Sequence, residues 1–279
     1  SDEEMLLDIR LNTLSKFVDK FVIVEANYKH NGDFKKQNFN PEKFKKFENK
    51  IEYIFIDKLP KGLNVVNSHD NKDVKTSKNI RNSIMLEHHQ RNMISDGLTS
   101  ASKNDLVLIS DVDEIPILDN LNFENNNNNL IFFKQKMFYY KFNLILPNLD
   151  WYGSKACKIK DLKNVDFLRS IKNKSYPFYR VDTFFSDNKH QSVKIVENGG
   201  WHFSNLKNIE ELERKFLNDE NHSEYEEKGH SLKRIKANVQ NRSIDYDHNA
   251  KKDSDQRFNS TKLQVIDKNI LPEYIQNNF

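Results

Sequence analysis

Hydrophobic and polar positions alternate in blocks along the first part of the chain. Apolar residues at helical spacing over 5–14 predict a helix, and the apolar run 21–24 predicts a short buried strand. The same step from helix to strand ends again at 51–56, and a helix over about 77–100 leads into a third strand at 106–109. Strands that alternate with helices predict an α/β fold with a mostly parallel sheet between helices.

The pattern changes after Pro116. Short apolar segments predict strands of a mixed, more antiparallel region, at 130–133, 137–140, 156–159 and 192–196. From Ile209 onward, apolar residues at helical spacing predict two amphipathic helices. We therefore expect a main α/β domain over residues 1–207 and a helical extension over 208–279 that packs on the same domain.

The composition is that of a soluble protein with a sizeable core, since 37% of the 279 residues are hydrophobic. The 44 basic and 41 acidic residues leave a net charge of +3, so the chain as a whole has no electrostatic field that would attract nucleic acid. One cysteine, Cys157, excludes an internal disulfide framework. No apolar run approaches the ~20 residues that span a bilayer, and Ser1–Glu4 is too polar for a signal peptide. We expect a cytoplasmic protein, or a soluble fragment of a longer one.

The most informative segment is Ser110-Asp111-Val112-Asp113-Glu114, which places three carboxylates directly after the apolar run 106–109. At an effective dielectric of ~20, each pair of such charges ~4 Å apart costs roughly 4 kcal/mol, and a divalent cation turns this cost into attraction. Mg²⁺ or Mn²⁺ takes one or two protein carboxylates and completes its shell with water and phosphate oxygens. Because ligands of α/β sheets bind at the carboxyl ends of strands, the segment predicts chemistry on a phosphate-bearing molecule. Pro116 is expected to end regular structure just beyond the acids.

Two other Asp-x-Asp pairs show how specific this signal is. Asp245-Tyr246-Asp247 and Asp253-Ser254-Asp255 have the same spacing, but neither follows an apolar strand. We expect them to be solvated loop carboxylates, which is also the alternative interpretation of Asp111 and Asp113. The apolar run before Asp111 favours the metal site.

A second unusual cluster is Gly199-Gly200-Trp201-His202. Its glycines allow close approach of the backbone to a ligand, and His202 offers a nitrogen ligand for the metal. Trp201 offers a flat face for a sugar or a base. The alternatives are a hydrogen-bonded structural histidine and a tryptophan packed in the core.

Two residues near other predicted strands could contact a nucleotide. Glu25 ends the first strand, where it could accept hydrogen bonds from a ribose or base, or be a surface carboxylate. Arg91 lies in the helix before the acidic strand, where it could bind a diphosphate in bidentate fashion, or be solvated.

In combination, five segments resemble glycosyltransferase family 17, the family of β-1,4-mannosyl-glycoprotein 4-β-N-acetylglucosaminyltransferases and their bacterial and viral relatives. The resemblance runs from about residue 4 to about residue 240. In chain order, the segments are Asp8-Ile9-Arg10-Leu11-Asn12, Phe21-Val22-Ile23-Val24-Glu25-Ala26-Asn27, Gln90-Arg91-Asn92, Leu108-Ile109-Ser110-Asp111-Val112-Asp113-Glu114-Ile115-Pro116 and Gly200-Trp201-His202-Phe203-Ser204.

The resemblance implies a GT-A fold, a nucleotide-sugar donor such as UDP-N-acetylglucosamine (UDP-GlcNAc), and Mn²⁺ or Mg²⁺. It also implies inversion at the anomeric carbon of the sugar that is transferred to a glycan or glycoconjugate hydroxyl. On this basis Asp113, with or without Asp111, binds the metal, and His202 completes the protein ligands. Asp111 alternatively binds the ribose.

The resemblance also implies roles for residues around the donor. Glu25 and Asn27 would flank the nucleotide, and Arg91 would neutralise phosphate charge. Trp151 could line the acceptor or donor-sugar pocket, with Trp201 as a further substrate contact.

An inverting transfer needs a general base, normally Asp or Glu, within about 3 Å of the attacking hydroxyl. The sequence does not identify this base. Glu114 and Asp182 are the first candidates, and each is also consistent with a structural role. The further candidates are Asp150, Asp219 and Glu220.

Two other classes of protein are compatible with parts of the pattern. A phosphatase of the haloacid dehalogenase type also uses Asp-x-Asp after an apolar strand, but usually near the start of the chain and with Thr or Val after the second Asp. Here Glu114 follows, and 110 residues precede the motif. The other alternative is a non-catalytic nucleotide- or sugar-binding protein on a GT-A scaffold.

Overall fold

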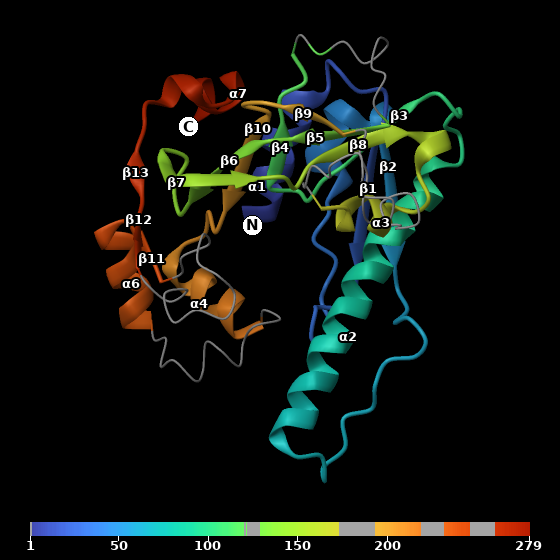
Figure 1. Ribbon diagram of the computed structural model, residues 1–279, viewed down its shortest axis with the longest axis vertical. Coiled ribbons are helices and arrows are strands. Elements are labelled where there is room, and N and C mark those ends of the chain that lie inside the picture. The colour runs from blue at the N-terminus through green and yellow to red at the C-terminus, as the bar shows by residue number, and fades with distance from the viewer. Residues whose placement is uncertain (1, 120, 122–128, 173–192, 219–231, 246–259) are drawn as a thin grey trace, which may run out of the picture. The chain divides into compact units, whose positions relative to one another are not determined.

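The computed structural model describes residues 2–119, 121, 129–172, 193–218, 232–245 and 260–279 (Figure 1). The chain forms two compact units. One, which we call the acidic-loop unit, comprises residues 1–18, 101–206 and 238–279, and the other, the β1–β2 unit, comprises residues 19–100 and 207–237. The division predicted from the sequence, at residues 207 and 208, stays a prediction.

The β1–β2 unit contains the parallel pair that the first half of the sequence predicts. Strand β1 (Phe21–Ala26) pairs with β2 (Ile51–Ile56) in register along its whole length. Helix α2 (Lys72–Asn92) starts after Asn71, whose side chain accepts a hydrogen bond from the Val74 amide. The other helical elements in the described part of this unit are the 3-10 helices Pro41–Lys50 and Met93–Leu98, helix α4 (Ile209–Asn218) and the first residues of α6 (Leu232–Asn241).

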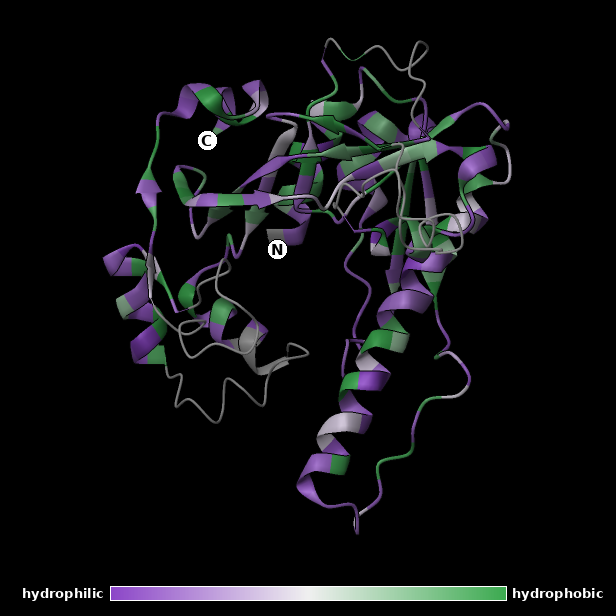
Figure 2. Cartoon of the chain, viewed as in Figure 1, coloured by the Kyte–Doolittle hydropathy of each residue, from purple (hydrophilic) through white to green (hydrophobic). Residues whose placement is uncertain are grey.

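Hydrophobic residues concentrate on the strands and are interspersed with polar ones along α2 (Figure 2). The core of the β1–β2 unit joins Ala26, Tyr28, Ile56 and Leu86, which brings one face of α2 against the strand pair. None of the helices in the described part of the chain has the length and apolar composition needed to cross a membrane.

The described part of the acidic-loop unit is built on a five-stranded and a four-stranded sheet with helices around them. The five-stranded sheet has the order β13-β7-β6-β10-β4, and its strands are Gln264–Val265, Leu144–Trp151, Gln135–Tyr139, Gly200–Ser204 and Glu114–Pro116. The four-stranded sheet has the order β3-β8-β5-β9, and its strands are Leu106–Ile109, Lys155–Lys158, Leu130–Phe133 and Val193–Val196. The helices are α1 (Asp2–Leu14), α3 (Val165–Ser170) and α7 (Glu273–Asn278). A strand pair, β11 (Ser243–Ile244) with β12 (Thr261–Lys262), and 3-10 helices at Ile159–Asp161 and Lys268–Ile270 complete it.

The α/β class is confirmed, but the prediction of a mostly parallel sheet is wrong for the described strands. Only the β1–β2, β6–β10 and β5–β9 pairs are parallel there, and antiparallel pairs outnumber them. Strand β3, which precedes the acids, pairs antiparallel with β8. A short apolar run marks a buried strand without specifying the direction of its partner, so the pattern could not reveal this.

Regular structure ends at Pro116, as expected, although a short strand precedes it there. Pro116 is the last residue of β4, where it lies opposite Gly200 of β10. Strand β4 is at the edge of its sheet, where a residue without an amide hydrogen is tolerated. Gly200 has φ 135°, and a Cβ there would overlap the Ile115 carbonyl oxygen, so this pairing depends on glycine.

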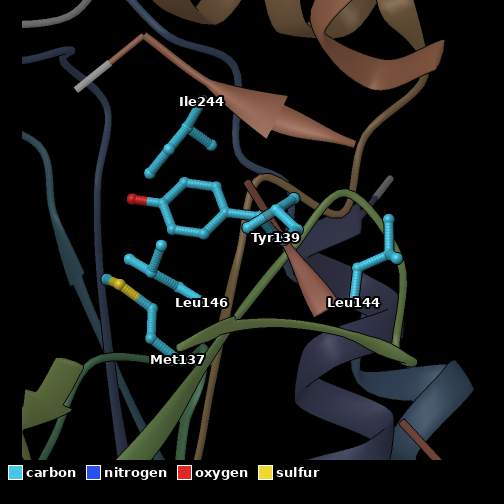
Figure 3. Packing of buried hydrophobic residues seen from close by; sticks show 6 residues of the cluster. Met137, Tyr139, Leu144, Leu146 and Ile244 are labelled. Atoms are coloured by element: carbon cyan, nitrogen blue, oxygen red, sulfur yellow. The ribbon is translucent and has the colours of Figure 1, made fainter. Parts of the chain in front are cut away.

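One face of the five-stranded sheet is covered by a hydrophobic cluster that includes Ile244 of β11 and Leu263, the residue after β12. Figure 3 shows Ile244, Leu146 and Met137 around the ring of Tyr139. Trp151 packs against this cluster from the end of β7. The cluster therefore supports the same sheet face on which His202 lies, because His202 is next to Met137 in the parallel β10–β6 pair.

We expect the thiol of Cys157 to be inert in the folded protein. It is buried in β8 between Val107 and Leu130 of the neighbouring strands, and burial raises its pKa to about 12. A thiol-specific disulfide reagent at pH 8 should therefore react at least ~100-fold more slowly with the native protein than with the protein in urea, because the thiolate is the reactive form. Because folding raises the pKa of Cys157, the contribution of its protonated thiol to the free energy of unfolding is complete below about pH 8.5 and decreases as the pH rises toward 12. Equal reaction rates in both states would contradict the burial of β8.

Candidate functional site

The acidic segment forms a tight loop, residues Ser110–Glu114, between β3 and β4. The Glu114 amide donates to the Asp111 carbonyl at 3.1 Å, which closes the turn. Strand β4 then pairs antiparallel with β10, so that Glu114 lies opposite His202. The Phe203 amide also donates to the Asp113 carbonyl at 2.9 Å. The fold thus brings together the two segments, separated in sequence, that were predicted to form a site.

Arg10 of α1 fixes the backbone of this loop. Its guanidinium donates to the carbonyl oxygens of Glu114 (2.5 Å) and Asp111 (3.3 Å) and to the Ser110 hydroxyl (2.6 Å). Burial lowers the pKa of Arg10 to about 10, while the Glu114 and Asp111 charges act in the opposite direction. The sequence analysis assigned no role to Arg10. The sequence signal for a buried role of Arg10 was its place between two apolar residues, Ile9 and Leu11, which are both fully buried in the structure.

Glu114 is fully buried and both of its carboxylate oxygens are occupied. Oε1 accepts from the Trp151 indole nitrogen (2.7 Å) and from Nη2 of Arg169 (3.2 Å). Oε2 accepts from Nη1 of Arg169 (2.7 Å) and from the Asp111 amide (3.0 Å). A Cβ at residue 153 would overlap this carboxylate, so Gly153 leaves the space that Glu114 fills.

Arg169 links the carboxylates to one another. It lies near the end of α3, a helix that begins after Asn164, whose side chain accepts from the Phe167 amide. Besides Glu114, Arg169 binds Oδ2 of Asp111 at 2.7 Å and the Gly153 carbonyl. Burial alone would lower the pKa of Arg169, but the Asp111 and Glu114 charges outweigh it and raise the pKa above the ordinary value. No sequence signal identified Arg169, which lies 58 residues from Asp111 on an otherwise ordinary helix.

Asp113 faces His202. Oδ2 of Asp113 lies 3.3 Å from Nε2 of His202, and the ring of Trp151 lies 4.8 Å from the imidazole ring, centroid to centroid. Burial opposes protonation of His202, but the hydrogen bond and charge of Asp113, with the Glu114 and Asp111 charges, raise its pKa above the ordinary value. Within the described part of the chain, Nδ1 of His202 is buried and has no hydrogen-bond partner.

Among the side chains of this site, Asp113 and His202 form the pair that could hold a metal ion. The described residues contain no ready group of three His, Cys, Asp or Glu side chains for a cation, and Asp111 is turned toward Arg169. Adjacent ligands of an octahedral ion with bonds of about 2.1 Å lie about 3 Å apart. The 3.3 Å between Oδ2 and Nε2 is compatible with that spacing. One or two protein carboxylates, completed by water and phosphate oxygens, are the usual pattern for Mg²⁺, and Asp113 would supply one of these carboxylates.

Three predicted nucleotide contacts belong to the β1–β2 unit. Glu25 is buried there and accepts from the amides of residues 38 and 39 and from the Tyr53 hydroxyl. Asn27 donates to the Asp57 carbonyl at 3.1 Å, and Arg91 pairs with Glu87 at 2.5 Å. Glu25 therefore holds the backbone of residues 38 and 39 in place. Its position at the end of a strand did not predict this structural role.

The two tryptophans lie on different sides of the sheet that carries His202. Successive residues of a strand point to opposite faces, so Trp201 points away from the face of its neighbour His202. Trp151 contacts the His202 ring, as described above. The structure thus brings Trp151, and not Trp201, next to Asp113 and His202.

Several sequence candidates remain to be placed. Asp150 is described and pairs with Lys134 at 3.0 Å, and Asp245 accepts from the Asn238 amide group at 2.7 Å. The other candidates and comparison residues lie outside the described residues, namely Asp182, Asp219, Glu220, Asp247, Asp253 and Asp255.

Comparison with known proteins places these residues in a sequence family. The model of a family described as glycosyltransferase family 17 matches residues 1–242, which include the acidic loop, Arg10, Arg169 and His202. No curated protein and no solved structure matches the chain.

Proposed function

The chain belongs to glycosyltransferase family 17, and we propose that it is an inverting, metal-dependent enzyme that transfers N-acetylglucosamine from UDP-GlcNAc to a glycan hydroxyl. The observation that carries the proposal is the Asp113–His202 pair, at 3.3 Å, on a loop whose other two carboxylates both pair with Arg169. We further propose that the nucleotide-binding part has the GT-A architecture.

Asp113 and His202 would hold Mn²⁺ or Mg²⁺, which supplies positive charge to the diphosphate of the leaving group. Asp111 exposes 49% of its side chain even with one oxygen on Arg169, which supports a contact with the ribose or the metal. Asn27 and Arg91 remain the candidates for contacts with a nucleotide and its phosphates. Glu25 would act by holding the backbone of residues 38 and 39.

Glu114 suits a positioning role better than the role of general base. A base must reach the attacking hydroxyl, and Glu114 is inaccessible, with donors on both oxygens. Together with Arg10, it holds Asp111 and Asp113 in place, so that the loop does not have to reorganise when the donor binds. Asp182 remains the candidate for the base, and Trp151, next to His202, remains the candidate for a contact with the transferred sugar.

The proposal is tested by incubating the protein with Mn²⁺, a panel of UDP-sugars and a mixture of acceptor glycans, and by measuring the release of UDP. We expect release to be fastest with UDP-GlcNAc and to stop when a chelator removes the metal. NMR of the product should show a β-linkage from the α-linked donor. UDP binding without turnover for any donor would favour the non-catalytic binding protein, and release of phosphate from phosphate monoesters would favour the phosphatase.

A further inference from the structure

A cavity of about 500 Å³ lies on the Trp201 side of the five-stranded sheet. It is bounded by the last turn of α1, the segment that follows β4, and α7 with the residues just before it. All of these segments belong to the acidic-loop unit. The cavity has the size of small-molecule sites, which range over roughly 300–1,000 Å³. Because Trp201 and His202 point to opposite faces of β10, it is distinct from the Asp113–His202 pair.

The indole of Trp201 is held in a fixed orientation at this cavity. Its ring nitrogen donates to the Ile270 carbonyl at 2.7 Å, and the side chain remains partly exposed. Buried leucines lie beside it in the lining, namely Leu14, Leu118 and Leu271. A pre-oriented aromatic ring offers a flat apolar face at little cost in side-chain entropy.

The polar groups of the lining are mostly neutral or paired. Lys16 and Asp119 form an ion pair at 3.3 Å. The side chains of Glu273 and Asn277 are exposed, and neither side chain has a hydrogen-bond or ion-pair partner among the described residues. With one cation that is already paired and two carboxylates, this lining disfavours a phosphate or a nucleotide.

We propose that the cavity binds a short segment of a neutral glycan, apart from the site of transfer. A pyranose ring has an apolar C–H face, which would lie on the Trp201 indole, and a rim of hydroxyl groups. Asn277 can both donate to and accept from these hydroxyls, and Glu273 accepts two hydrogen bonds at each oxygen. The cavity adds affinity for glycan chains and does not depend on which donor the enzyme uses.

The test is a titration with neutral oligosaccharides, namely chitotriose, mannotriose and maltotriose, followed by calorimetry and by the NMR signal of the Trp201 indole N–H. The chain has two tryptophans, so Trp201→Phe assigns this signal by its disappearance. We expect at least one oligosaccharide to shift it and to bind at least ten-fold more weakly to the Glu273→Ala/Asn277→Ala double variant. Because these two side chains are exposed and unpartnered among the described residues, the double variant should fold normally.

Two controls separate this site from the site of transfer. Glu210→Ala changes an exposed carboxylate of α4, outside the cavity lining, and should bind the oligosaccharide as the unchanged protein does. Asp113→Asn should also bind it normally, even if transfer is lost. The proposal is overturned if no oligosaccharide binds, if binding is lost in Asp113→Asn but kept in the double variant, or if UDP or inorganic phosphate displaces the glycan.

Discussion

Replacing Asp113 by asparagine should lower UDP-sugar turnover by about 10²–10³-fold, the loss typical when one group that stabilises transition-state charge is removed. Asparagine has nearly the same shape, and the hydrogen bond from the Phe203 amide to the residue 113 carbonyl is retained. What is lost is the negative charge next to His202 that would hold the metal. Isothermal titration with UDP, with and without Mn²⁺, should show that metal-dependent binding is lost as well.

The same experiment with alanine variants gives a matched comparison. Asp113→Ala and His202→Ala should abolish Mn²⁺-dependent UDP binding. Asp247→Ala and Asp255→Ala remove aspartates with the same sequence spacing but without an apolar run such as 106–109 before them, and they should bind UDP normally. Similar losses in all four variants would contradict the assignment of the metal to the acidic loop.

Replacing Glu114 by alanine should lower the free energy of unfolding by about 3–5 kcal/mol, because it removes the fully buried partner of the Arg169 guanidinium and leaves only the half-exposed Asp111 carboxylate to balance that charge. Only 10% of the Arg169 side chain is exposed, and Glu114 supplies two of its interactions. The Trp151 indole nitrogen and the Asp111 amide would lose their acceptor too. Urea unfolding followed by tryptophan fluorescence measures the effect, since both tryptophans belong to the acidic-loop unit.

A surface ion pair of the same unit serves as the control. Asp119 pairs with Lys16 at 3.3 Å, and more than half of each side chain is exposed. Asp119→Ala should therefore cost no more than about 1 kcal/mol. Glu114→Gln keeps the volume of the side chain and tests the charge alone, and it should be nearly as destabilising as alanine. A loss in Glu114→Ala no larger than that in Asp119→Ala would show that the Glu114 network does not stabilise the fold.

The strands with the clearest apolar runs could be predicted from the sequence almost to the residue. Strand β2 coincides with the predicted 51–56, and β3 with 106–109. Strands β7 and β10 were not predicted. Polar residues interrupt the apolar pattern of β7, and the glycines at the start of β10 suggested a ligand loop. Side chains from other elements contribute to the burial of such strands, so the local spacing of apolar residues does not identify them.

The sequence identified two segments that the fold brings together, but not the arginines that hold them. The apolar run before Asp111 identified the acidic loop, and the Gly-Trp-His pattern identified His202, which the fold does place next to Asp113. Arg10 and Arg169 were not identified, because Arg10 lies 100 residues from Ser110 and Arg169 lies 58 residues from Asp111. In the sequence, each is an ordinary cation of a helix. Glu114 was a candidate base only because it follows Asp113. Its complete burial is a property of the tertiary structure.

The hydroxyl of Tyr274 in α7 donates to Oδ2 of Asp8 in α1 at 2.7 Å, across 266 positions of sequence. Helix α1, which also carries Arg10, is therefore synthesised well before its partner helix α7. At roughly 5–20 residues per second, α1 waits for tens of seconds before α7 is available. We expect the acidic-loop unit to complete its folding only after synthesis has passed Tyr274.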